Sequence, residues 1–292
     1  MSDHWKQTLL ELIRRTSCDL PEDVEQAMRK SLEAETSDTA RATLTAMLEN
    51  VALARDREAP LCQDTGTPTF SWHIPRGVDA VALEKQARAA IAEATRRGWL
   101  RRNTLEALSG KSQDDNVADG TPVCHFVQED REDVVVWLLQ KGGGSENVST
   151  QYSLPDASLN AGRDLDGVRA CLLDAVWKAQ GHGCAPGVLG VCVGSDRAGG
   201  FIVAKEQLLR PLGDRAKDPE LAVLEERVLR DANKLGIGPM GLSGATTLLG
   251  VKIAARPRVP ASFFVTVAYM CWACRRRGVR AQTDGKMIEL LG

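Results

Sequence analysis

The sequence predicts a mixed α/β (α+β) fold, with a helical part at about residues 1–100 and a mixed α/β part at about residues 120–292. Apolar residues recur at helical spacing through the first 57 residues. Continuous apolar, β-branched runs begin only after residue 130, and glycine-rich loops follow them. No internal repeat or clear linker separates the two parts, so we expect one domain over residues 1–292.

Short acidic side chains mark the expected helix starts. Asp19, Asp38 (after Ser37) and Asp79 precede amphipathic segments, and a short carboxylate there can accept from the first backbone N–H groups. The helices are expected at about residues 19–35, 37–56, 79–99, 164–180 and 218–235. The polar stretch 100–123 is expected to be a loop.

Three apolar runs are expected to form buried strands, at residues 133–140, 188–193 and 262–270. The first runs into KGGGSEN, the second follows GCAPG, and the third ends in CWACRRRG. Loops at strand ends are where α/β proteins commonly build their sites.

The overall charge excludes several classes of partner. Lys and Arg number 37 against 39 Asp and Glu, which gives a net charge of −2. This balance provides no basic surface for nucleic acid or an anionic membrane. The N-terminus has no apolar signal sequence, and the longest nearly apolar run, residues 263–274, is too short to cross a bilayer. We therefore expect a cytoplasmic protein.

Eight cysteines are many for a chain in a reducing compartment, where metal or redox use is more common than disulfides. Cys62 (in PLCQDTGTP), Cys184 (in GCAPG) and one of Cys271 and Cys274 lie in loops far apart in the sequence. Three such thiols indicate a metal cluster that keeps one open position, as a Lewis-acid catalyst requires. The cysteines in apolar patterns are expected to be structural: Cys18, Cys124, Cys171 and Cys192.

Other interpretations of these motifs stay open at this point. Cys62 could be a catalytic thiol, for which His73 is the nearest histidine in the sequence. Cys271 and Cys274 could both lie in the core or form a redox pair. KGGGSEN (141–147) could form a phosphate loop, a carboxylate-binding nest or a simple turn, but it lacks the ending of a Walker loop.

Five motifs in order, CQDTGT, KGGGSEN, GCxPG, NKLGIGPMGLSGATTLLGVKI and YMCWACRR, resemble the iron–sulfur (class I) fumarate hydratase and tartrate dehydratase family over about residues 45–280. The resemblance implies a [4Fe–4S] cluster with three cysteine ligands and one open iron that binds substrate. The matching positions are Cys62, Cys184 and Cys271, because the first cysteine of the CWAC segment is the one that the family pattern fixes.

The resemblance also implies the reaction, which is reversible hydration of a C4 dicarboxylate, most simply fumarate to (S)-malate. The open iron would polarise the substrate hydroxyl, and Asp64 resembles the acid/base residue. The substrate-binding residues that it implies are Gln63, Arg101 (with Arg102 as its alternate), Gly143 and Gly144.

Two departures from the family pattern affect these expectations. Many relatives carry a histidine twelve residues before the third cysteine, where this chain has Val259. The chain ends at Gly292 without the smaller C-terminal domain of single-chain members, which predicts an α subunit that joins a β subunit, as α₂β₂. Tartrate or mesaconate could replace fumarate as substrate. A non-catalytic iron–sulfur protein or a thiol-based redox protein using Cys271 and Cys274 are the alternatives from other classes.

Overall fold

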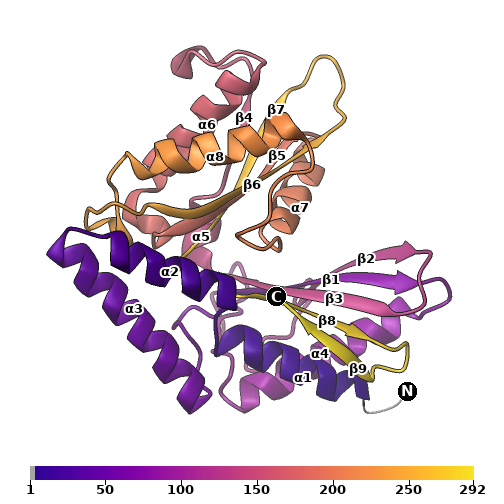
Figure 1. Cartoon of the computed structure of the whole chain (residues 1–292). Coiled ribbons are helices and arrows are strands. Elements are labelled where there is room, and N and C mark those ends of the chain that lie inside the picture. The colour runs from indigo at the N-terminus through magenta and orange to yellow at the C-terminus, as the bar shows by residue number, and fades with distance from the viewer. Residues whose placement is uncertain (1–3) are drawn as a thin grey trace. The chain divides into compact units, whose positions relative to one another are not determined.

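The computed structural model describes residues 4–292, and its contacts divide the chain into two compact units (Figure 1). Unit 1 consists of the chain up to Glu22, Glu49–Gly143 and Arg275–Gly292, and unit 2 of Asp23–Leu48 and Gly144–Cys274. The chain therefore passes from one unit to the other between Glu22 and Asp23, within the helix Asp38–Arg57, and at the peptide bonds Gly143–Gly144 and Cys274–Arg275. The last two of these passages lie inside motifs that the sequence singled out.

Unit 1 is a five-stranded sheet with helices packed on it. Its elements are α1 (His4–Ser17), the end of α3 (Asp38–Arg57), β1 (Thr67–Pro75), α4 (Ala80–Arg96), β2 (Val123–Glu129), β3 (Val134–Lys141), β8 (Arg276–Ala281) and β9 (Met287–Leu291). The strand order is β2-β1-β3-β8-β9, in which only β1 and β2 are parallel. The core between α1, α4 and the sheet contains Trp5, Phe70 and Trp72, all at most 1% exposed.

Unit 2 is built around a four-stranded sheet in the order β4-β7-β5-β6. Its elements are most of α2 (Glu22–Ala34), the start of α3, α5 (Gly143–Asn147) beyond its first residue, β4 (Thr150–Ser153), α6 (Leu165–Ala179), β5 (Gly187–Gly194), α7 (Arg197–Gln207), α8 (Pro219–Asn233), β6 (Leu248–Arg256) and β7 (Phe264–Met270), with short 3₁₀ turns at Ala157–Leu159, Gln180–Gly183 and Pro239–Gly241. Leu189 and Val191 of β5 share a core with α6 and α8, while Gly190 between them faces α7. Since side chains alternate along a strand, helices cover both faces of this sheet.

The predicted fold class is confirmed, and the helices α3, α4, α6 and α8 lie where the sequence placed them. The N-cap prediction for Asp79 is also confirmed, because its carboxylate accepts the Ala82 N–H at 3.1 Å. The N-cap prediction for Asp19 is wrong: α2 begins only at Glu22, and the Asp19 carboxylate binds Arg55 and Arg277 instead.

The three predicted strands are present as β3, β5 and β7, but β1 was not anticipated, because it lies within the part expected to be helical. Its sequence, TPTFSWHIP, nevertheless alternates as a strand should: Phe70, Trp72 and Ile74 are buried, and Ser71 and His73 between them are partly exposed. The strand forms because this alternation places three large apolar side chains in the core of unit 1.

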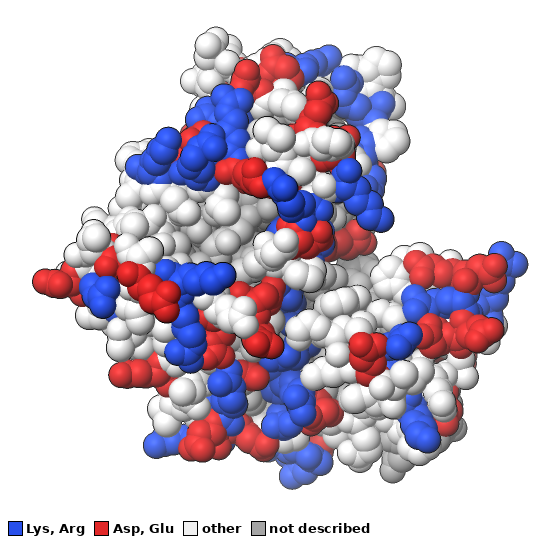
Figure 2. Space-filling model, viewed as in Figure 1, with Lys and Arg blue, Asp and Glu red and all other residues white. Residues whose placement is uncertain are grey.

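The surface carries both signs of charge side by side. At the ends of β1, β2 and β3, acidic and basic residues alternate (Figure 2), where Arg131 bridges Glu129 at 3.1 Å and Asp133 at 2.7 Å. Within residues 4–292, no helix is both long and apolar enough to span a membrane.

Candidate active site

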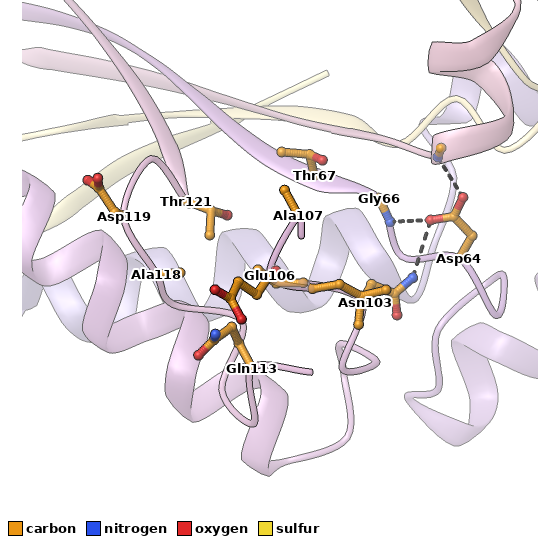
Figure 3. A pocket seen from close by; sticks show the side chains of 13 residues that line it. Asp64, Gly66, Thr67, Asn103, Glu106, Ala107, Gln113, Ala118, Asp119 and Thr121 are labelled. Carbon is orange, nitrogen blue, oxygen red and sulfur yellow. Dashed lines mark hydrogen bonds between the residues drawn. The ribbon is translucent and has the colours of Figure 1, made fainter. Parts of the chain in front are cut away.

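A pocket of about 790 Å³ opens in unit 1 beside the CQDTG loop (Figure 3). The residues that line it are Asp64, Gly66, Thr67, Asn103, Thr104, Leu105, Glu106, Ala107, Gln113, Ala118, Asp119, Thr121 and Gly143. They come from three segments: the CQDTG loop with the start of β1, the polar stretch before β2, and the glycine loop after β3. Two of the residues predicted for the site, Asp64 and Gly143, therefore line one pocket.

Three N–H donors orient the Asp64 carboxylate at one end of this pocket (Figure 3). Oδ1 accepts from the Gly66 backbone at 2.9 Å and from Asn103 Nδ2 at 3.3 Å. Oδ2 accepts from the Gly143 backbone at 2.7 Å. An ionised carboxylate is an acceptor only, so three N–H donors complement its base form.

The backbone of the CQDTG loop is fixed on both sides of Asp64. Leu61 donates its N–H to the Ser17 carbonyl at 2.9 Å, and Thr65 accepts the Arg101 N–H through Oγ1 at 3.3 Å. Gly66 has φ +74°, and a Cβ there would lie 2.6 Å from the Lys141 carbonyl carbon. Only glycine therefore fits at position 66, where the loop crosses the end of β3.

The glycine loop after β3 approaches Asp64 equally closely. A Cβ at Gly142 would lie 2.7 Å from Asp64 Oδ2, so a side chain at this position would displace the carboxylate. The Gly143 N–H, expected to donate to substrate, donates to Asp64 in this structure. Gly144 belongs to unit 2, where a Cβ on it would lie 3.4 Å from the His182 carbonyl oxygen, beside the Cys184 loop.

The two candidate arginines differ in their surroundings. Arg102 forms an ion pair with Asp114 at 3.1 Å, and both side chains are well exposed. The Arg101 side chain is exposed, and no ion pair or hydrogen bond ties it to another residue of 4–292. Arg101 is therefore the more available cation, although neither arginine lines the pocket. Gln63 is exposed beside Asp64.

Asn103 is a site residue that sequence reasoning missed. It follows Arg101 and Arg102 in the polar stretch 100–123, lines the pocket, and donates to Asp64. Its place is fixed by its own backbone, because its N–H donates to Asn116 Oδ1 at 2.9 Å, and Asn116 is buried. The only clue in the sequence was its neighbourhood to the arginine candidates.

Unit 2 places Cys184 and Cys271 next to each other. The N–H of Trp272 donates to the Cys184 carbonyl at 3.1 Å, and the Tyr269 ring lies against Gly183 and Gly187 on either side of Cys184. Burial, followed by the nearby Cys271 and Cys184 thiols, raises the pKa of Tyr269. Both thiols are partly exposed, whereas Cys274 is fully buried.

Cys62 lies in unit 1, two residues before Asp64, and is exposed. Neither unit by itself therefore contains all three candidate ligands. Within residues 4–292, no group of three His, Cys, Asp or Glu side chains is placed to bind a metal ion. The donor chemistry nevertheless fits an iron–sulfur group, because all three candidate thiols lie in loops and reach the protein surface.

The four cysteines assigned to the structure behave differently from these three. Cys18, Cys171 and Cys192 are buried, and Cys124 is half-buried on β2. Burial raises the pKa of Cys18 and Cys171 to about 12 and that of Cys124 and Cys192 to about 11. Neutral thiols of this kind are poor ligands and poor nucleophiles.

Val259 lies in the connection between β6 and β7 and is 65% exposed. Cys271 follows the opposite end of β7, and a strand of seven residues is about 23 Å long. Arg163 and Arg258 fix this connection by donating to its carbonyl groups, including that of Pro260 at 3.1 and 3.2 Å. Within unit 2, Val259, which stands where many relatives carry a histidine, therefore lies away from Cys271.

Comparison with known proteins identifies the family of the chain. The family model described as fumarate hydratase (Fumerase) matches residues 6–280. A protein of Geobacillus stearothermophilus named "Putative fumarate hydratase class I" is 46% identical over 98% of this chain, which spans 56% of that relative's length. A Methanocaldococcus jannaschii protein named "Putative L(+)-tartrate dehydratase subunit alpha" is 33% identical over 96% of this chain and 98% of its own length. The L(+)-tartrate dehydratase subunit alpha of Escherichia coli K12 is 29% identical over 91% of this chain and 86% of its own.

Proposed function

Because the chain belongs to the fumarate hydratase (Fumerase) family, we propose that it is the α subunit of a hydro-lyase that adds water reversibly to a C4 dicarboxylate. The reaction that we favour is fumarate plus water to (S)-malate, and the 46% identity to the relative from Geobacillus supports it. Tartrate dehydration is the second candidate, supported by two relatives named as subunit alpha that this chain matches over nearly their whole lengths.

The observation that carries the proposal is the Asp64 carboxylate, oriented by Gly66, Asn103 and Gly143 at the edge of the pocket. In the dehydration direction, this carboxylate takes a proton from the carbon beside a substrate carboxylate. In the hydration direction, Asp64 returns that proton to the same carbon. A general base aligned in this manner contributes about 10²- to 10⁴-fold to the rate.

The negative charge that develops on the substrate carboxylate during this transfer requires donors. We assign this role to the Gln63 side chain, which is exposed beside Asp64, and to the N–H of Gly144, the first residue of the glycine loop that belongs to unit 2. The Arg101 side chain has no hydrogen bond or ion pair within residues 4–292 and suits the role of a clamp for a substrate carboxylate. These residues are substrate-binding residues in our proposal, with Asp64 as the acid/base residue.

We assign Cys62, Cys184 and Cys271 as ligands of a [4Fe–4S] cluster. The adjacency of Cys184 and Cys271 in unit 2 and the partial exposure of both thiols support this set over one that uses the buried Cys274. When bound, a cluster with an open iron supplies a Lewis acid for the hydroxyl that leaves or enters.

Iron and acid-labile sulfide, measured after anaerobic reconstitution, test this assignment. The wild-type chain should bind about four of each, as a [4Fe–4S] cluster requires. Cys184→Ser should lose both, and Cys192→Ser, which changes a buried thiol on β5, should retain them. If the wild-type chain binds no iron, the hydro-lyase proposal loses its Lewis acid and a thiol-redox role becomes the better explanation.

A second substitution separates the cluster from the redox alternative. Cys274→Ser should retain the cluster and most of the activity if Cys271 alone is a ligand. It should abolish function if Cys271 and Cys274 act as a redox pair. Activity is measured with fumarate, tartrate and mesaconate.

The same assay tests Asp64 as the acid/base residue. Asp64→Asn keeps the side-chain shape and should lower kcat about 10²-fold or more.

We further propose that the chain works in the cytoplasm with a β subunit, as an α₂β₂ assembly. The relatives named as subunit alpha support a partner chain. Size-exclusion chromatography of the chain, expressed alone and with a tartrate dehydratase-type β subunit, tests the stoichiometry. Activity that appears only in the co-expressed sample would support the assembly.

A further inference from the structure

Arg275 is a buried arginine whose contacts lead to Asp64. Its side chain is 1% exposed, and Nη1 donates to the Asp64 backbone carbonyl at 2.7 Å. Its own carbonyl accepts the Gln140 N–H at 3.0 Å. Arg275 therefore connects the CQDTG loop to the end of β3, immediately before the glycine loop whose Gly143 N–H binds the Asp64 carboxylate.

Burial of this arginine destabilises the folded state, because a buried cation loses its hydration. Within residues 4–292, its Nε has no hydrogen-bond partner, and neither do the side-chain nitrogen and oxygen of Gln140, which is also fully buried. Burial of these atoms destabilises the fold. The unfavourable arrangement is explained if Arg275 has a task that an apolar residue cannot perform.

The neighbouring arginine shows what a purely structural role looks like. Arg277 is 8% exposed and donates to the carbonyl groups of Arg15, Leu20 and Gly292 at 2.7–3.1 Å. It also binds the Asp19 carboxylate. None of these contacts involves Asp64 or a residue that binds it, so Arg277 provides a matched control for Arg275.

We propose that Arg275 is a positioning residue for the acid/base reaction, an inference that rests on the role of Asp64 in the proposed function. The guanidinium fixes the carbonyl of Asp64, while Gly66, Asn103 and Gly143 fix its carboxylate. Contacts at both ends leave the residue one orientation, in which the carboxylate lies at the pocket. Without Arg275, the loop backbone rotates and the carboxylate loses its alignment.

Amide hydrogen exchange of the cluster-free chain tests this without any activity. The Gly143 N–H binds Asp64, so it should exchange at least about 10-fold faster in Arg275→Gln, the effect of losing a hydrogen bond from a charged group. The Trp137 N–H serves as the internal reference. The Gln140 N–H bonds Arg275 on the β8 side, so alternation along β3 turns the Trp137 N–H to β1, opposite Ser71. In Arg277→Gln, the ratio of the Gly143 and Trp137 rates should equal that of wild type, even if the overall stability falls.

Arg275→Lys keeps one cationic donor and should restore much of the protection, which also covers the case in which Arg275→Gln does not fold. In the assembled enzyme, Arg275→Gln should lower kcat at least about 10-fold with KM little changed, because alignment rather than binding is lost. An unchanged Gly143 to Trp137 ratio in Arg275→Gln would overturn the inference, as would an unchanged kcat. If only Arg275→Lys folds, a ratio equal to that of wild type would overturn it, because lysine reproduces the contact only in part. If the wild-type assembly hydrates no dicarboxylate, the proposed function fails, and the exchange ratio alone decides on Arg275.

Discussion

Gly66→Ala provides the sharpest test of how the CQDTG loop is built. Gly66 has φ +74°, a conformation that costs an L-residue about 1–2 kcal/mol. A Cβ there would also lie 2.6–2.9 Å from backbone atoms of Gln140 and Lys141, which cannot rotate away as a side chain could. Overpacking of this kind adds about 1–3 kcal/mol. We therefore expect Gly66→Ala to destabilise unit 1 by about 3 kcal/mol.

Gly77→Ala is the matched control at the other end of β1. Gly77 has φ +83°, but nothing lies within 4 Å of its Cβ position, so only the conformational cost of about 1–2 kcal/mol applies. At about 2–4 °C per kcal/mol, thermal unfolding followed by tryptophan fluorescence should show a loss of about 6–12 °C for Gly66→Ala and about half of that for Gly77→Ala. Equal shifts for the two variants would refute the close approach of the loop to β3.

Three further outcomes are expected. Asn103→Ala removes one donor to the Asp64 carboxylate, so kcat/KM should fall about 10-fold; an unchanged value would mean that the 3.3 Å contact does not matter. Iodoacetamide at pH 8, followed by mass spectrometry, should label the exposed Cys62 of the cluster-free chain well before Cys18, whose pKa burial raises to about 12. Burial opposes ionisation of Glu35, but hydrogen bonds from backbone N–H groups lower the pKa of its carboxyl below the unfolded value of about 4.3. The ionised carboxylate therefore stabilises the folded state above that value, and this contribution is lost as pH falls through the lower folded pKa. The Tm difference between wild type and Glu35→Gln should be constant above about pH 5 and shrink below it.

The helices could be predicted because their signals are local. Asp79, Asp164 and Asp218 precede α4, α6 and α8, and the carboxylate of each accepts a backbone N–H two or three residues further on. The competing case is Asp19, whose carboxylate is taken by Arg55 and Arg277 from distant parts of unit 1. A cap prediction fails when a tertiary ion pair claims the same oxygen atoms.

The order of the sheet in unit 1 could not be predicted in the same way. Its central strand β3 lies between β1, about 65 residues earlier, and β8, about 140 residues later. The start of β8, within RRRG, also hides its burial, because Arg276 and Arg277 are buried although arginine is rarely found inside proteins. The burial of Arg277 depends on distant carbonyl groups, such as that of Leu20, which no local pattern reveals.

In the candidate site, too, some residues could be predicted from local motifs and others could not. Asp64 and Gly143 belong to compact motifs that can be read directly, and the structure brings them together at 2.7 Å. Asn103 and Arg275 complete the surroundings of Asp64 from a polar loop and from the segment after Cys274. A sequence motif can identify the residues that carry out the proposed chemistry. The residues that orient them lie elsewhere in the sequence and are recognised only once the fold is known.

The charge of the pocket bears on why a partner chain is expected. Its described lining includes three acids, Asp64, Glu106 and Asp119, and no lysine or arginine. A dicarboxylate brings two further negative charges, and like charges in one site repel each other. Arg101, which does not line the pocket, can neutralise one carboxylate, so the second requires a further cation. A Lewis-acidic iron and basic residues of a β subunit are the groups that our proposal provides for it, which explains why the isolated chain should bind substrate poorly.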